Sequence, residues 1–99
     1  MFVAMSSFTV ANGLSTAVKD AFARRPHRVD QAPGFVRMDV ISPTETPDEI
    51  WLLTYWRDEA SYHAWHRSHE LHESHRDIPR GLKLVPHSAR MRFFEHVGS

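Results

Sequence analysis

The sequence predicts a single α+β domain over residues 1–99, in which an antiparallel sheet carries its helices on one face. Three observations predict this class. Four stretches have the apolar or alternating pattern of strands, two stretches have helical spacing, and a length of 99 residues fits one hydrophobic core. The resulting order, β-α-β-β-α-β, is that of a ferredoxin-like domain.

The first strand and the first helix are predicted from residues 2 to about 30. Residues 2–10 are rich in β-favouring types and end at the turn signal Asn12-Gly13. Helical spacing then relates the apolar residues Leu14, Ala17, Val18, Ala21 and Phe22. Pro26 should interrupt this helix, because proline lacks a backbone donor and clashes with the preceding turn. Val29 indicates that the helical path resumes before Pro33-Gly34.

The second and third strands are predicted on either side of a polar loop at residues 43–48. Residues 35–41 alternate with the period of a strand that has one buried face. Residues 50–56, IWLLTYW, are almost continuously apolar, so we expect a buried strand in a central position of the sheet. Trp51 and Trp56 are expected in its core.

The second helix and the last strand are predicted from residues 58 to 97. Asp58 is a plausible N-cap for a helix that runs to about Ser68, and a second helical stretch should continue through His75. Pro79-Arg80-Gly81 breaks that stretch. Residues 86–97 should form the last strand, with Met91, Phe93 and Glu95 on one face and Arg92, Phe94 and His96 on the other.

Composition argues against several classes of function. Twelve basic and twelve acidic residues cancel, so there is no electrostatic reason to expect nucleic acid or an anionic membrane as a partner. The absence of cysteine excludes disulfides and thiolate sites. The first residues lack the pattern of a signal peptide or a membrane span, and we therefore expect a cytoplasmic protein. There is also no G-x-S-x-G elbow, phosphate loop or H-E-x-x-H helix.

Five histidines recur at every third position between residues 63 and 75: His63, His66, His69, His72 and His75. Steps of three turn a helical wheel by roughly 300 degrees, so these side chains do not share one face as helical zinc ligands do. Most are expected to be solvated or packed at a helix edge. A lone histidine can nevertheless ligate a haem iron, and His75 is the best placed. The alternative is a histidine exposed near a helix C-terminus.

Other candidate binding residues are Trp65 and a group of arginines. Trp65 follows Ser61 and Tyr62 on a helix that must face the sheet, so its ring is a candidate pocket wall. Ligand carboxylates are candidate partners for Arg24, Arg25, Arg28 and Arg37. A chain of this length buries only about 60 to 65 per cent of its unfolded surface, and dimerisation would relieve such a thin core.

Three segments taken together resemble the antibiotic biosynthesis monooxygenase (ABM) superfamily: FTVANG, APGFVRMDV and LLTYWRDEASYHAWHRSHELHESH. The resemblance covers most of residues 2–97. It rests on the P-G-F strand entry and on the pattern T-x-W-x-[DS]-x-x-[AS]-[FY]-x-x-W-x-x-S. It implies small ferredoxin-like domains whose sheets pair in a dimeric α/β barrel, and hence a homodimer.

Within the superfamily the chain most resembles the IsdG-like haem-degrading monooxygenases. That resemblance implies haem as substrate and cofactor, His75 as the ligand of the haem iron, and Trp65 as the residue that presses on the porphyrin. It also implies that Phe22 and Arg25 border the pocket and that an external reductase supplies electrons. Ser6 stands where the family carries an asparagine in the distal pocket, which is a departure from the pattern.

Two other functions are compatible with the same resemblance. The fold also carries cofactor-independent monooxygenases of quinols and polycyclic phenols, in which Trp65, His75 and Ser6 would orient the phenol. A non-catalytic, ligand-binding dimer is the third interpretation. Fold by itself does not choose among them.

Overall fold

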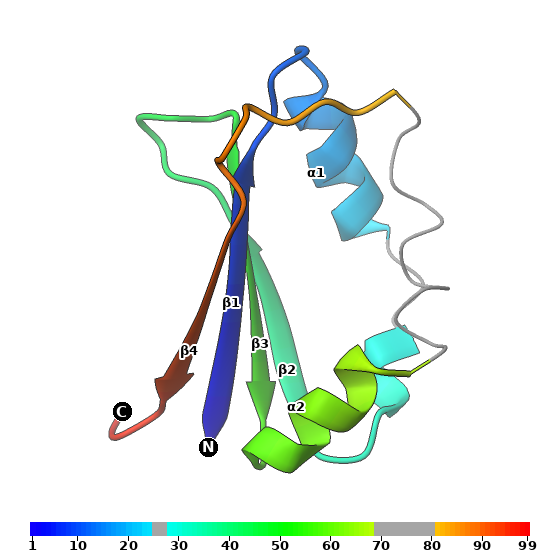
Figure 1. The fold of residues 1–99 in the computed structure, drawn as a ribbon, viewed down its shortest axis with the longest axis vertical. Coiled ribbons are helices and arrows are strands. Elements are labelled where there is room, and N and C mark those ends of the chain that lie inside the picture. Colours follow the sequence, from blue (N-terminus) through cyan, green and yellow to red (C-terminus); the bar gives the residue numbers. More distant parts are fainter. Residues whose placement is uncertain (25–27, 69–80) are drawn as a thin grey trace.

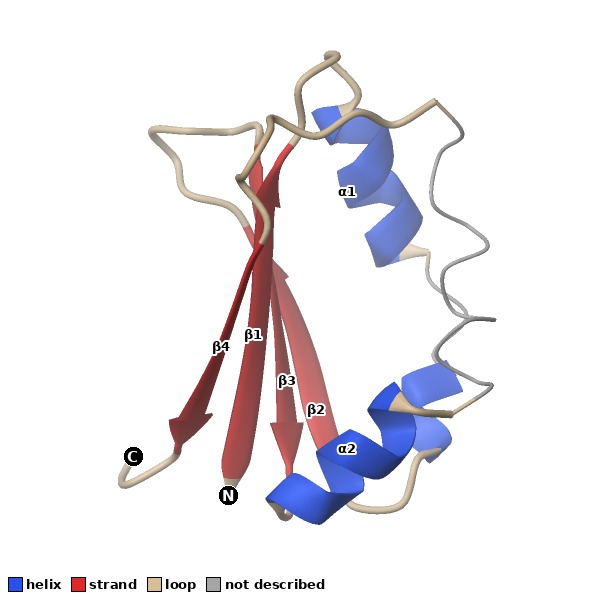
Figure 2. Cartoon of the chain, viewed as in Figure 1, coloured by secondary structure: helices blue, strands red, loops and turns tan. Residues whose placement is uncertain are grey.

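The computed structural model describes residues 1–24, 28–68 and 81–99. Its elements are β1 (Phe2–Thr9), α1 (Ser15–Ala23), a 3₁₀ helix η1 (Arg28–Gln31), β2 (Phe35–Ile41), β3 (Glu49–Trp56), α2 (Glu59–His66) and β4 (Arg90–Glu95). The strands form one antiparallel sheet in the order β2-β3-β1-β4. Both α-helices lie on the same side of it (Figure 1; Figure 2). The predicted ferredoxin-like arrangement and the central position of β3 are confirmed.

Helix α1 starts without a side-chain cap. Leu14 holds the N-cap position, and the Ser15 hydroxyl donates instead to Oδ1 of Asp48, 2.7 Å away in the loop before β3. The helix ends at Ala23, ahead of Pro26, as the sequence predicts, and η1 supplies the expected return to helical backbone. In the described parts of the chain, no helix is both long and apolar enough to cross a membrane.

Strand β4 begins four residues later than predicted, at Arg90 instead of Pro86. The intervening residues form a turn, in which the Ser88 amide donates to the Val85 carbonyl at 3.1 Å and His87 adopts a φ of 63°. The Ser88 hydroxyl accepts the Thr9 amide at 3.1 Å, so a side chain replaces the ladder bond at the end of β1. The predicted alternation of the strand's two faces agrees with its register against β1.

Two separate hydrophobic clusters lie on the helix side of the sheet. The first, which we call the α2 cluster, has as its buried members Ala4, Val29, Trp56, Tyr62 and Trp65. The second, the α1 cluster, has as its buried members Val10, Val18 and Ile50. Because each helix covers a different end of the sheet (Figure 1), each organises its own cluster.

The opposite side of the sheet carries no helix in the described residues, and this corrects one expectation. Trp56 is fully buried, as predicted for a core residue, but Trp51 is only half-buried. Successive side chains of a strand point to opposite faces, so Trp51 and Trp56 lie on different sides of the sheet. The indole of Trp51 donates to Oε2 of Glu49 at 2.8 Å. Strand β3 is therefore covered on one face in the protomer.

Candidate functional site

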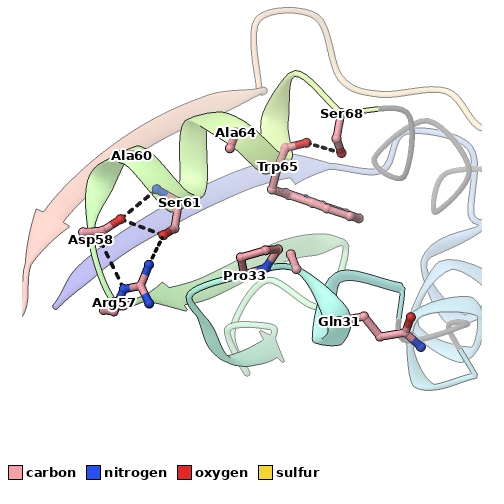
Figure 3. Close-up of a pocket in the computed structure, with 10 residues that line it drawn as sticks. Gln31, Pro33, Arg57, Asp58, Ala60, Ser61, Ala64, Trp65 and Ser68 are labelled. Atoms are coloured by element: carbon pink, nitrogen blue, oxygen red, sulfur yellow. Dashed lines mark hydrogen bonds and ion pairs between the residues drawn. The ribbon is translucent and has the colours of Figure 1, made fainter.

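The first turn of α2 is held by a hydrogen-bond network around Asp58, the predicted N-cap. Its Oδ1 accepts the Ser61 amide at 2.8 Å and the Ser61 hydroxyl at 2.7 Å, and its Oδ2 pairs with Nε of Arg57 at 3.2 Å (Figure 3). These donors, the Ser61 hydroxyl first, lower the pKa of Asp58 from 3.8 to about 2. The carboxylate therefore caps the helix, and the predicted start of α2 is confirmed.

Trp65 lies at the other end of α2 and is buried against the sheet side. Its exposed fraction is 8%, and it belongs to the α2 cluster together with Val29. Ala32 packs against the same cluster. The Trp65 carbonyl accepts both the Ser68 amide at 2.9 Å and the Ser68 hydroxyl at 2.6 Å. These bonds satisfy a carbonyl that the end of the helix would leave without a partner.

One edge of Trp65 borders a groove of about 570 Å³ between α2 and the segment that joins η1 to β2 (Figure 3). The groove is lined in part by Ala32, Pro33, Ala60, Ser61, Ala64 and Trp65. The indole thus lies between the α2 cluster and an open cleft. Neither Ser6 nor Phe22 lines this groove, so the predicted role of Trp65 as the wall of a pocket shared with them stays a prediction.

Ser6 lies between the two hydrophobic clusters. Its neighbours on the same face of β1 are Ala4, in the α2 cluster, and Phe8, which packs on the α1 cluster. Ser6 is half-buried, and its side chain makes no hydrogen bond within the part of the chain that the structure describes. The sheet therefore presents a hydroxyl at the point where its apolar surface is interrupted.

Phe22 projects from α1 into the other cluster. It is half-buried and packs against the α1 cluster. The structure therefore places Phe22, Ser6 and Trp65 on one side of the sheet, in that order along it. Arg25 and His75 lie outside the described residues, so their predicted places in the site stay predictions.

A residue that the sequence did not single out lies beside Ser6. Thr54 of β3 pairs with Ala4 of β1, while Ser6 pairs with Leu52, so Ser6 and Thr54 are diagonal neighbours on the same face. In the sequence Thr54 is only the first position of the pattern T-x-W-x-[DS]-x-x-[AS]-[FY]-x-x-W-x-x-S. The signal that reveals it is the pairing register, which requires the tertiary structure.

The histidines of α2 that the structure describes belong to the helix surface. His63 contacts Oε2 of Glu59 at 3.1 Å, and Nδ1 of His66 lies 3.4 Å from the Tyr62 hydroxyl oxygen. Burial raises the pKa of Tyr62 above its usual value of 10. The placement of His63 and His66 agrees with the interpretation of solvated, helix-edge residues. Within the described residues, no group of three or more histidines and carboxylates converges as a metal site would require.

The fold and these residues define a ferredoxin-like α+β domain with two helices on one face of its sheet. Trp65 lies at one end of that face and Phe22 at the other. Residues 1–77 match the family described as antibiotic biosynthesis monooxygenase. The chain belongs to that family.

Similar proteins include enzymes of haem degradation and a cofactor-independent oxygenase. The chain is 25% identical over 79 residues to the mycobilin-producing haem oxygenase of Mycobacterium tuberculosis, covering 78% of this chain and 75% of that protein. The solved structure of the haem-degrader MhuD from M. tuberculosis, with two haems bound in its active site, superposes with a TM-score of 0.80 at 21% identity. That match covers 100% of this chain and 98% of the other.

The structure of SnoaB, a cofactor-independent oxygenase from Streptomyces nogalater, superposes with a TM-score of 0.76 at 17% identity. This match covers 99% of this chain and 94% of SnoaB. At these identities the two structural likenesses establish the fold alone.

Proposed function

We propose that this protein is a haem-degrading monooxygenase that uses dioxygen and electrons from an external reductant. The observation that carries the proposal is the sequence relationship to the mycobilin-producing haem oxygenase, which extends over 78% of the chain. The arrangement of the candidate site supports it independently, because the described residues suit a large, flat, mostly apolar ligand.

The described residues suit haem because the hydrophobic core consists of two separate clusters. The face of the sheet beneath the helices bears two clusters, with Trp65 in one and Phe22 packed on the other. A flat apolar ligand between these aromatic residues would join the clusters and bury surface that each helix leaves uncovered. One polar group available between them is the half-buried hydroxyl of Ser6.

Each proposed site residue has a distinct role. His75 lies within the family match and supplies the imidazole that binds the haem iron. Trp65 packs against the porphyrin plane, Phe22 and Arg25 border the pocket, and the Arg25 guanidinium suits a haem carboxylate. Ser6 donates a hydrogen bond from the sheet, with a shorter reach than the asparagine of the family pattern. When bound, haem supplies the iron that activates dioxygen and the ring that is oxidised.

We also propose that the active form is a homodimer in which the helix-free side of the sheet is covered by a second copy. Ile41 is 51% exposed and Phe94 is 39% exposed on that side, and two arginines stack on aromatic rings there: Arg37 on Tyr55 at 4.5 Å and Arg92 on Phe94 at 5.1 Å. Exposed apolar surface bordered by charged residues is typical of protein interfaces. A second sheet would bury it and would thicken a thin core.

The test of the proposal is a haem titration followed by reduction. The wild-type protein should shift the Soret band on binding haem, and the band should then disappear when oxygen and ascorbate or a reductase are supplied. His75→Ala should abolish the shift, whereas the matched control His72→Ala should retain it. Trp65→Ala should bind haem with slower loss of the band, because a wall of the pocket is missing.

Different results would select the other interpretations. A stable Soret band under reducing, aerobic conditions would identify a non-catalytic haem-binding protein. No haem binding, with oxygen uptake on quinols or polycyclic phenols, would identify a cofactor-independent monooxygenase. An unchanged titration for His75→Ala would rule out that histidine as the iron ligand.

A further inference from the structure

Thr54 occupies an unusual position for a polar side chain, because it lies on the core face of a central strand. Ile50, Leu52 and Trp56 share its face of β3, and all three belong to or pack on the two hydrophobic clusters. Its partners across the sheet are Ala4 on β1 and Met38 on β2. The side chains next to Thr54 along β3 and directly across the sheet are therefore apolar, and Ser6 is its polar diagonal neighbour.

The Thr54 hydroxyl has no hydrogen-bond partner in the described part of the chain. The residue is half-buried, and its oxygen is not one of the fully buried side-chain atoms without a partner, so the hydroxyl keeps access to the space above the sheet. Valine has nearly the same shape and would extend either apolar cluster. A hydroxyl at this position instead offers a hydrogen-bond donor to a ligand on that side of the sheet.

Ser6, on the neighbouring strand β1, is also half-buried, and its hydroxyl also has no hydrogen-bond partner among the described residues. In the register, Ala4 faces Thr54 and Ser6 faces Leu52, so the two hydroxyl-bearing side chains lie diagonally across β1 and β3. The backbone positions of diagonal neighbours are about 7 to 8 Å apart, and their Cβ atoms are somewhat closer. Both hydroxyls can therefore approach one small ligand group placed between them. Together they interrupt the apolar surface between the Trp65 end and the Phe22 end.

We propose that Thr54 and Ser6 form a two-hydroxyl floor that donates hydrogen bonds to a small oxygen-containing ligand bound at the haem iron. This inference rests on the proposed function and deepens it, because it assigns a second donor to the site. It also explains how a serine serves where the family pattern has an asparagine: two short donors from adjacent strands replace one longer donor.

The experiment uses carbon monoxide as a probe on the reduced, haem-loaded protein. A donor near the bound molecule lowers its C–O stretching frequency by favouring electron transfer from the iron into the ligand. Thr54→Val and Ser6→Ala should each raise that frequency, and the double variant should raise it further. Thr54→Ser keeps the hydroxyl and should have the C–O stretching frequency of the wild type. The control is Thr46→Val, in the exposed loop before β3.

Thermal unfolding of the ligand-free proteins separates this role from a structural one. Thr54→Val should unfold at the same temperature as the wild type or higher, because a methyl group replaces an unpartnered hydroxyl. A C–O frequency in Thr54→Val equal to that of Thr46→Val would overturn the assignment of Thr54 while leaving haem binding intact. Failure of the wild-type protein to bind haem would overturn the proposed function, and the hydroxyl floor with it.

Discussion

Gly34 packs against Ser61 with no room for a side chain. A Cβ on residue 34 would lie 2.6 Å from Cβ of Ser61 and closer still to its hydroxyl oxygen, and Gly34 has a φ of +84°. Its carbonyl accepts the Arg57 amide at 2.7 Å. The entry to β2 is thereby joined to the first turn of α2, the helix that carries Trp65.

Gly34→Ala should therefore destabilise the protein by about 2 kcal/mol or more, from backbone strain at positive φ and from overpacking against Ser61. Gly13→Ala is the matched control, because Gly13 has a φ of +74° but nothing lies within 4 Å of an added Cβ. It should suffer the backbone strain alone. Urea unfolding measures both, and equal losses would show that the contact with Ser61 is unimportant.

Asp58 should make stability depend on pH in the acid range. Its pKa falls from 3.8 to about 2 because the folded protein hydrogen-bonds the carboxylate. A lowered pKa in the folded state contributes stability above pH 4, and this contribution is lost as pH falls through 2. Asp58→Asn retains a capping side chain but cannot titrate.

The difference in unfolding midpoint between the wild type and Asp58→Asn should therefore shrink steadily from pH 5 to pH 2, as followed by urea unfolding at several pH values. Asp58→Ala, which also lacks the cap, should be the least stable variant at pH 5. A difference between wild type and Asp58→Asn that stays constant over this range would contradict the role of the charge.

Tyr62 should make stability depend on pH in the alkaline range. It is 5% exposed and contacts the rings of Phe2, Trp56 and Phe93, and burial raises its pKa above 10. A raised pKa means that the stability is intact below pH 10 and is lost as pH rises through the folded-state value.

Tyr62→Phe keeps the ring and gives up only the 3.4 Å contact with His66. It should match the wild type within about 1 kcal/mol at pH 7 and become the more stable of the two at pH 11. Unfolding midpoints at both pH values measure the change. The interpretation fails if the wild type keeps its relative stability at pH 11.

The helix-free side of the sheet should mediate self-association. Phe94→Glu places a charge on an exposed apolar residue of β4 and should convert the proposed dimer to a monomer. Thr16→Glu, on the exposed surface of α1, adds the same charge elsewhere and should leave the dimer intact. Sedimentation velocity distinguishes the two states, and a monomeric wild type would refute the proposed interface.

Local signals in the sequence were sufficient to predict the elements. The alternation of residues 35–41 predicts β2 with its observed bounds, and Asp58 marks the start of α2, because both depend on side chains within a few residues of one another. Pro26 separates α1 from η1 for the same local reason. The order of these elements was then enough to predict the class of fold.

The tertiary structure decided which side chains meet. The run IWLLTYW does not show that Trp56 is in the core while Trp51 faces the helix-free side, because an apolar run has no alternation to reveal its faces. The diagonal pair of Ser6 and Thr54 depends on the register between β1 and β3. The contact of Gly34 with Ser61 depends on how α2 docks. Propensity and capping act along the chain, whereas register and docking are decided by contacts between residues far apart in it.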